Sequence, residues 1–273
     1  MSFLTTCQKA SATDTAGMST ETLSPKQREI RSREHRILDV ARPLVRDGGL
    51  DAVRIDAVAD AIGMTRGTVY NHFGGREEII LALAARAVSR RLELFRFAAG
   101  SSDRSRRRIA AVGIACEVYA TEMADDFAVE HLIRHDSVWT RGSDRRREQL
   151  AADEAACMGT VGTVIRDAVD AGDLRLPRRH TVNDVLYGLW SLTYGGLAIA
   201  MTSPSLPDIG IADPHAAIRR NCNAMLDGLD WQPLYADGGS GPADYSRWVR
   251  KIIGPLRTEA RRIVDANAGG GAA

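Results

Sequence analysis

The chain has 273 residues, of which 44% are apolar and 26% are charged. This is enough for a buried core in one large domain or two ordinary ones. Its 36 basic and 35 acidic side chains leave a formal charge of +1. The balance excludes a histone-like or RNA-coating protein, because such proteins need a large positive excess to release counterions from nucleic acid. It leaves room for a local basic surface.

The four cysteines lie far apart in the sequence and form no C-x-x-C pair (Cys7, Cys116, Cys157 and Cys222). This spacing argues against a structural zinc site and against a disulfide scaffold. We therefore expect no metal, no cofactor and a reducing, cytoplasmic location. The first 17 residues lack the apolar region of a secretory signal, and residues 1–24 are polar and aperiodic, which predicts a disordered tail.

From Pro25 onward the apolar residues recur at helical spacing, and no segment alternates as a half-buried strand would. The pattern predicts an all-α protein. The expected helices cover residues 26–47, 55–62, 66–72, 76–98, 104–124, 126–139, 144–171, 181–202, 213–229 and 244–266. Gly100-Ser101-Ser102-Asp103 is typical of a hinge, and a Gly/Ala-rich flexible tail follows the last helix.

The segment from Val58 to Val69 has the spacing of a helix-turn-helix. Two short helices that cross closely need a small residue at the contact and a turn residue that tolerates positive φ, and Ala59 and Gly63 meet these needs. Thr65 can cap the second helix through the backbone N–H of Thr68. An ordinary helical hairpin remains the alternative.

The residues that follow are Tyr70-Asn71-His72-Phe73-Gly74-Gly75-Arg76-Glu77-Glu78-Ile79. This run resembles the Y-x-H-F-x-x-K-E-x-L signature of the TetR (tetracycline-repressor-like) family of transcriptional regulators. The resemblance covers about residues 28–90. It implies a three-helix DNA-binding domain over 25–98 and a helical-bundle ligand-sensing and dimerisation domain over 99–232. A Gly-rich break after Pro233 predicts an extension over 233–273 with an amphipathic helix, beyond the usual family core. No G-x-S-x-G, P-loop or Rossmann fingerprint appears, so we expect no catalytic residue.

The resemblance also implies DNA contacts. Thr65, Arg66, Gly67 and Thr68 would open the recognition helix in the major groove. Arg66 would read guanine, and Thr68 a thymine methyl or a phosphate. The remaining residues would hold the phosphate backbone or face it (Tyr70, Asn71, His72 and Arg76). For His72, packing against the first helix is the plain alternative.

Two residues depart from the family pattern. Arg54 stands where a capping threonine is usual, so we expect it to contact phosphate directly instead. Asp56 occupies a position that is often basic, and an acid there would repel the DNA backbone. Between positions 24 and 96 the sequence carries 14 basic and 10 acidic residues, so this part is mildly basic.

The C-terminal two-thirds supply candidates for an effector pocket. These are polarisable or aromatic residues on expected helices (Cys116, Tyr119, His131, His135, Trp139, Trp190 and Tyr194). Each is also suited to an ordinary core position. His131 and His135 lie one helical turn apart, a spacing that can hold a metal, but no glutamate follows His131 as in H-E-x-x-H.

Two further helices allow more than one role. Residues 185–201 are almost uncharged and short for a bilayer span, which favours a buried dimer helix, paired with 213–229 in an intersubunit four-helix bundle, over membrane insertion. The helix over 244–266 either packs back on the body or meets a membrane or a partner.

Together these features predict a homodimeric, ligand-responsive DNA-binding regulator. We expect a repressor that binds a near-palindromic double-stranded operator, responds to an unidentified small molecule and needs no membrane. The alternative is a helical enzyme that binds a metal or small molecule and whose N-terminal hairpin is incidental. A membrane-associated adaptor is a third class.

Overall fold

The computed structural model describes residues 24–133, 138–235 and 242–268, and within them every regular element is a helix, so the prediction of an all-α fold is confirmed. The α-helices are α1 (Pro25–Gly48), α2 (Ile55–Ile62), α3 (Arg66–His72), α4 (Arg76–Ala99), α5 (Ser105–Glu122), α6 (Ala124–Ile133), α7 (Val138–Arg141), α8 (Asp144–Asp170), α9 (Val182–Thr202), α10 (Pro214–Gly228) and α11 (Pro242–Ala268). Two 3₁₀ turns, η2 (Leu50–Ala52) and η3 (Pro207–Ile209), complete the set. The predicted tails at both ends lie outside the described residues, except for Ser24.

One predicted helix crosses residues that the structure does not describe. The sequence pattern indicated a single helix over 126–139. Helices α6 and α7 account for its two described parts, and residues 134–137 between them lie outside the described residues. One continuous helix over this range therefore stays a prediction.

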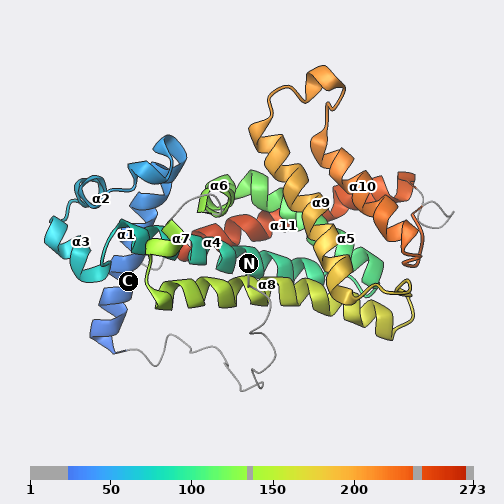
Figure 1. The fold of residues 1–273 in the computed structure, drawn as a ribbon, viewed down its shortest axis with the longest axis horizontal. Coiled ribbons are helices and arrows are strands. Elements are labelled where there is room, and N and C mark those ends of the chain that lie inside the picture. The colour runs from blue at the N-terminus through green and yellow to red at the C-terminus, as the bar shows by residue number, and fades with distance from the viewer. Residues whose placement is uncertain (1–23, 134–137, 236–241, 269–273) are drawn as a thin grey trace.

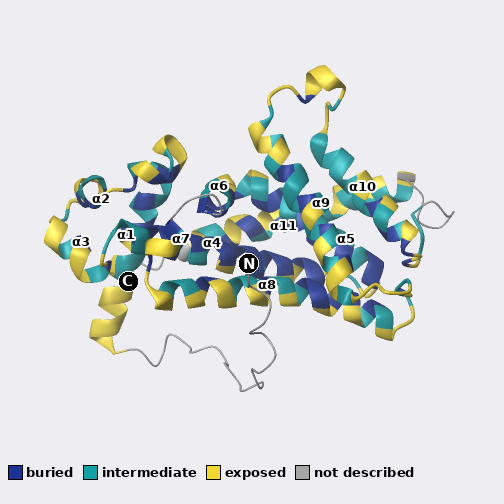
Figure 2. Ribbon diagram, in the orientation of Figure 1, coloured by how far each residue is buried: buried dark blue, intermediate teal, exposed yellow. Residues whose placement is uncertain are grey.

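The long helices α4 and α8 lie side by side and form the spine of the molecule (Figure 1). Helix α4 is buried along most of its length, as its dark colour in Figure 2 shows. It packs against α1 and also against α5, α6, α7, α8 and α11. The same rigid helix is therefore shared by the small N-terminal bundle of α1–α3 and the larger C-terminal bundle.

Helices α9 and α10 pack closely at the end of the molecule away from α2 and α3 (Figure 1). Two glycines of α9, Gly188 and Gly196, lie two turns apart and face α10. A Cβ atom at Gly188 would lie 2.5 Å from Met225 Cε, and one at Gly196 would lie 2.5 Å from Ile218 Cγ1. A larger residue at Gly188 would need the flexible end of Met225 to move, and one at Gly196 would need the branched side chain of Ile218 to shift, so both glycines favour this close packing.

The C-terminal helix α11 packs back on the body, against α4 and α5. Leu256, Ala260 and Ile263 are buried on its inner face. On its outer side Arg257 and Arg261 each reach Glu122 at 3.1 Å. The plain prediction for this helix is therefore confirmed.

Candidate nucleic-acid interface and interior cavity

The turn between α2 and α3 is built around Gly63. This residue has φ 69° and ψ 35°, in the left-handed region that disfavours side chains with a Cβ. The N–H of the next residue, Met64, donates to the carbonyl of Ala59 at 3.0 Å. This is the hydrogen bond of a glycine-terminated helix, and it brings α3 across α2 within three residues.

Thr65 begins the second helix as predicted. Its hydroxyl accepts a hydrogen bond from the backbone N–H of Thr68 at 3.1 Å, and the two threonine hydroxyls lie 2.9 Å apart. Buried Val58, Val69 and Phe73 hold the inner sides of the pair against α1 and α4. The cap and the core together fix the direction in which α3 points.

The outer side of α3 is polar and open to solvent. Most of its residues are exposed (Thr65, Arg66, Gly67, Tyr70 and Asn71). In Figure 2, α3 lies at the left end of the molecule and is yellow over much of its surface. Tyr70 is 54% exposed although it is a large aromatic residue. An aromatic hydroxyl held in water beside an arginine and an amide is suited to hydrogen bonding with a polyanion.

Arg66 is already engaged within the protein. Its Nε lies 2.7 Å from Oδ1 of Asp56 on α2, although the arginine side chain remains 69% exposed. An exposed ion pair of this kind contributes little to stability. The pair orients the guanidinium of Arg66, and Asp56 would compete with DNA for that group. This contact is one way in which Asp56 would oppose DNA binding, as expected from the sequence.

Arg76 also makes internal contacts. Its Nη2 donates to the carbonyl of Leu50 at 2.9 Å, and its Nη1 and Nη2 each lie 3.3 Å from Oδ1 of Asp51. These bonds tie the start of α4 to η2. The sequence assigned Arg76 to a phosphate contact, and the internal clamp is a role that sequence reasoning missed.

The remaining predicted DNA contacts differ in their exposure. Arg54 precedes α2, is exposed, and makes no side-chain cap bond, as its side chain predicts. His72 is half-buried, and its Nδ1 is buried with no hydrogen-bond partner among the described residues. Both the phosphate contact and the alternative for His72, packing against the first helix, stay predictions.

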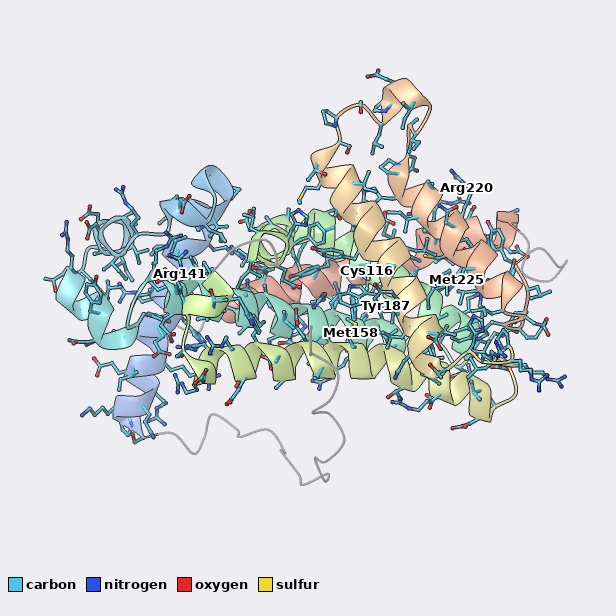
Figure 3. The ribbon with its side chains drawn as sticks, viewed as in Figure 1. Cys116, Arg141, Met158, Tyr187, Arg220 and Met225 are labelled. Carbon is cyan, nitrogen blue, oxygen red and sulfur yellow. The ribbon has the colours of Figure 1, made fainter. Side chains whose placement is uncertain are left out.

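The C-terminal bundle encloses a mainly apolar cavity of about 80 Å³ between α4, α5, α8, α9 and α10. Four of the predicted ligand residues line it, namely Cys116, Tyr119, Trp190 and Tyr194. Figure 3 shows Cys116 and Met158, another wall residue, in the middle of the bundle and far from α2 and α3. The cavity therefore lies at a distance from the exposed face of α3.

The other three predicted ligand residues are not part of its wall. The Nδ1 atom of His131 lies 3.1 Å from the hydroxyl of Tyr194, so His131 stands behind a wall residue. Trp139 lies on α7 and is absent from the lining. His135 lies outside the described residues. Within the described ranges no three His, Cys, Asp or Glu side chains gather as a metal site would require.

A buried ion pair lines the cavity and was missed by sequence reasoning. Arg91 Nη2 lies 3.1 Å from Glu130 Oε2, with both side chains less than 8% exposed. The hydroxyl of Tyr119 donates to Glu130 Oε1 at 2.5 Å. Burial and the charge of Glu130 hold the pKa of Tyr119 well above its usual value, so the phenol keeps its proton. The spacing of apolar residues on α4 does not predict that an arginine of this helix is buried, so Arg91 could not be identified from the sequence.

The comparisons with known proteins agree with this geometry. A family model described as "Bacterial regulatory proteins, tetR family" matches residues 37–83. An HTH-type transcriptional repressor of Mycobacterium tuberculosis (strain ATCC 25618 / H37Rv) is 30% identical over 126 residues, which span 44% of this chain and 62% of the repressor. The match thus covers less than two-thirds of that relative.

Solved structures share the fold. A TetR family transcriptional regulator from Thermus thermophilus superposes with a TM-score of 0.55 at 20% identity, over 71% of this chain and 98% of its own. A putative transcriptional regulator from Saccharomonospora viridis, solved in complex with choline, gives 0.56 at 18% identity, over 72% and 96%.

These matches are to regulators rather than enzymes, in agreement with the expectation that the chain is not an enzyme. The matched segment begins in α1, contains the helix-turn-helix and ends in α4, where the turn, the cap and the exposed polar face have just been described. Residues 37–83 are therefore similar to the tetR family of bacterial regulatory proteins, and the chain shares its fold with a solved regulator of that family.

Proposed function

We propose that this protein is a homodimeric, ligand-responsive transcriptional repressor that binds a near-palindromic operator. The observation that carries the proposal is the capped helix α3, which presents an exposed polar face behind a tight glycine turn. Such a helix enters the major groove with its N-terminal residues against the base edges. Location in the cytoplasm, where the DNA lies, follows from this proposal.

Direct base contact falls to Arg66, whose guanidinium can reach O6 and N7 of a guanine once it leaves Asp56. Thr68 contacts a thymine methyl or a phosphate. Tyr70, Asn71 and Arg54 are exposed and contact the backbone, with His72 and Arg76 at its edge. The backbone contacts set affinity and register, and Arg66 sets the sequence.

The dimer interface is assigned to α9. This helix is long and apolar enough to span a membrane by length and composition, yet only 22% of its most apolar window is buried within the chain. Tyr187 is 66% exposed and Ile199 is 53% exposed. Because its other face packs on α8 and α10, a second copy of α9 and α10 covers the apolar surface better than lipid does.

The effector site is assigned to the interior cavity. Its aromatic and apolar wall favours a small organic molecule, and the choline complex of the Saccharomonospora viridis regulator is consistent with a small molecule in this fold. Binding there would favour one arrangement of the two recognition helices. Coupling of this kind is typically about 1–3 kcal/mol.

A gel-shift titration with the DNA upstream of the protein's own gene tests the proposal, with selection from a random DNA pool as a second source of sites. We expect a complex that survives competitor DNA and weakens steeply with salt. The matched control is Arg66→Ala, which should lower the preference for one base pair. If no DNA gives a competitor-resistant complex, the repressor proposal fails.

A further inference from the structure

A second hollow lies at the junction of the two bundles, away from the interior cavity. It is a groove of about 620 Å³ between the N-terminal half of α1, the middle of α4 and the start of α8. In Figure 1 the first turns of α8 lie beside the lower part of α1. Its volume falls within the range of small-molecule sites.

Arginines are the commonest charged residues in the groove. Five of them and two glutamates, Glu34 and Glu93, line it. Three of the five already have carboxylate partners beside the groove, since Arg86 pairs with Asp39, Arg90 with Asp126 and Arg146 with Glu78. Glu93 has a partner outside the groove, since Arg262 on α11 lies 3.7 Å from its carboxylate. Arg31 on α1 and Arg145 on α8 are exposed at the two sides, and neither has an ion-pair partner in the part of the chain that the structure describes. Their charges are therefore open to an anion.

Arg86 lies in the wall with unsatisfied donors. Its side chain is only 9% exposed, and its Nη1 lies 2.7 Å from Asp39 Oδ1. Its Nε and Nη2 are buried and have no acceptor among the described residues, and the Nε of neighbouring Arg90 is in the same state. A buried donor without an acceptor destabilises the folded state.

The charged groups around Arg86 also affect its guanidinium. Burial and the like charge of Arg90 lower its pKa, and they outweigh the opposing effect of Asp39 and Asp126. At Arg86, burial and Arg90 thus outweigh the two carboxylates. An anion in the groove would add a favourable charge beside Arg86, although the Nε and Nη2 atoms themselves are closed to solvent.

The rest of the wall is apolar. Leu38 and Phe73 are buried beneath the groove, Ala82 and Ala85 contribute from α4, and Ile30 is 41% exposed at its edge. Of these apolar residues only Ile30 and Ala85 present an appreciable part of their side chains to solvent, and a fully hydrated ion would leave them uncovered. The site therefore fits a molecule with an apolar body and an anionic head.

We propose that this groove binds a small organic phosphate, with its apolar body on Ile30 and Ala85 and its phosphate oxygens against the exposed Arg31 and Arg145, beside Arg86. Arginine forks match phosphate oxygens in geometry and charge. The site is separate from the effector cavity and from the DNA-facing side of α3. Because α1 and α8 belong to different bundles, an occupant would join them.

Isothermal titration calorimetry on the full-length protein, without DNA, tests the proposal. The probe is 1-naphthyl phosphate, compared with inorganic phosphate and with 1-naphthol. We expect saturable binding of the naphthyl phosphate that is at least about tenfold tighter than either comparison compound, a difference of about 1.4 kcal/mol. Inorganic phosphate binding equally well would overturn the organic ligand, and naphthol binding equally well would place the ring in the apolar cavity instead.

Variants locate the site. Arg31→Ala with Arg145→Ala should weaken the naphthyl phosphate about tenfold, whereas Arg36→Ala, an exposed change on α1 outside the groove, should not. Arg86→Lys keeps the charge near Asp39 and removes the guanidinium fork, so it should also weaken binding. Unchanged affinity in the double variant overturns the proposal, and that variant changes only exposed residues, so loss of folding does not obscure the result.

Discussion

Asp56 Oδ1 and Arg66 Nε lie 2.7 Å apart, so the side chain best placed to read a base is paired with an acid of the preceding helix. Binding a guanine requires this pair to open. The arginine is 69% exposed, which makes opening inexpensive. The pair nevertheless sets a competition between Asp56 and DNA for one guanidinium.

Asp56→Asn should therefore tighten DNA binding. The change removes a negative charge near the phosphates and frees Arg66, and we expect affinity to rise by about three- to tenfold at low salt, with a smaller gain at high salt. Fluorescence anisotropy on one operator at several salt concentrations measures this. Asp60→Asn is the matched control, because Asp60 is exposed on the same helix and has no ion pair among the described residues. Equal gains in the two variants would exclude a specific role for Asp56.

The N-cap at Thr65 makes a separate prediction. Thr65→Ala removes the bond to the Thr68 N–H and should destabilise the N-terminal bundle by about 1 kcal/mol. Thr65→Ser keeps the acceptor and should cost much less. Urea unfolding measures the difference, and operator affinity measured in parallel should fall more for alanine than for serine. Identical stabilities of the two variants would show that the cap is not used.

Arg76 has two candidate roles, and a conservative change separates them. Arg76→Lys keeps the charge for a phosphate but loses the fork that reaches Leu50 and Asp51. If the internal clamp dominates, the variant should lose about 1–2 kcal/mol of stability, and the salt dependence of DNA binding should stay unchanged. A stable variant with altered DNA affinity would instead favour the phosphate role.

Features of this structure that depend on neighbouring residues could be predicted from the sequence, and contacts between distant helices could not. The bounds of α2 and α3, the positive φ of Gly63 and the cap at Thr65 were all predictable, because each depends on residues within four positions of one another. The internal partners of Arg66 and Arg76 depend on how helices are placed in space. Local sequence spacing carries no signal for them.

Some residues of the interior cavity wall could likewise be predicted from the sequence, and others could not. Cys116 and Tyr119 were found because aromatic and polarisable residues on an apolar stripe are natural wall residues. Arg91 and Glu130 were missed because charged residues are expected at the surface. They are tolerated inside only because α4 and α6 bring opposite charges within 3.1 Å. Tyr245 also reaches the cavity wall from α11, which the sequence analysis placed outside the family core.

The Arg91–Glu130 pair predicts a large stability effect. Glu130→Gln removes the charge opposite a guanidinium that is only 7% exposed, so the free energy of unfolding should fall by about 3–5 kcal/mol. Glu122→Gln changes the more exposed pairs with Arg257 and Arg261 and should cost less than about 1 kcal/mol. Urea unfolding compares the two. A small loss for Glu130→Gln would mean that the cavity admits enough water to solvate Arg91.

The cysteines on the cavity wall predict slow alkylation in the folded protein. Burial raises the pKa of Cys116 to about 12 and that of Cys222 to about 11, from an ordinary value of 9.0. At pH 9 their thiolate fractions should be about two to three orders of magnitude below those of free thiols. Iodoacetamide labelling with peptide mapping, with and without denaturant, measures the ratio for each cysteine.

The same shifts give the pH dependence of stability a sign. Above pH 9 the unfolded chain loses these thiol protons while the folded protein keeps them, so the folded state binds more protons and stability falls as the pH rises towards 11. Below pH 9 both states hold the protons and the thiols contribute no slope. Cys116→Ala should reduce the alkaline loss relative to the unchanged protein. Rapid labelling of Cys116 in the folded state at pH 8 would contradict both expectations, because it would require a thiolate exposed to water rather than a thiol enclosed by the cavity wall.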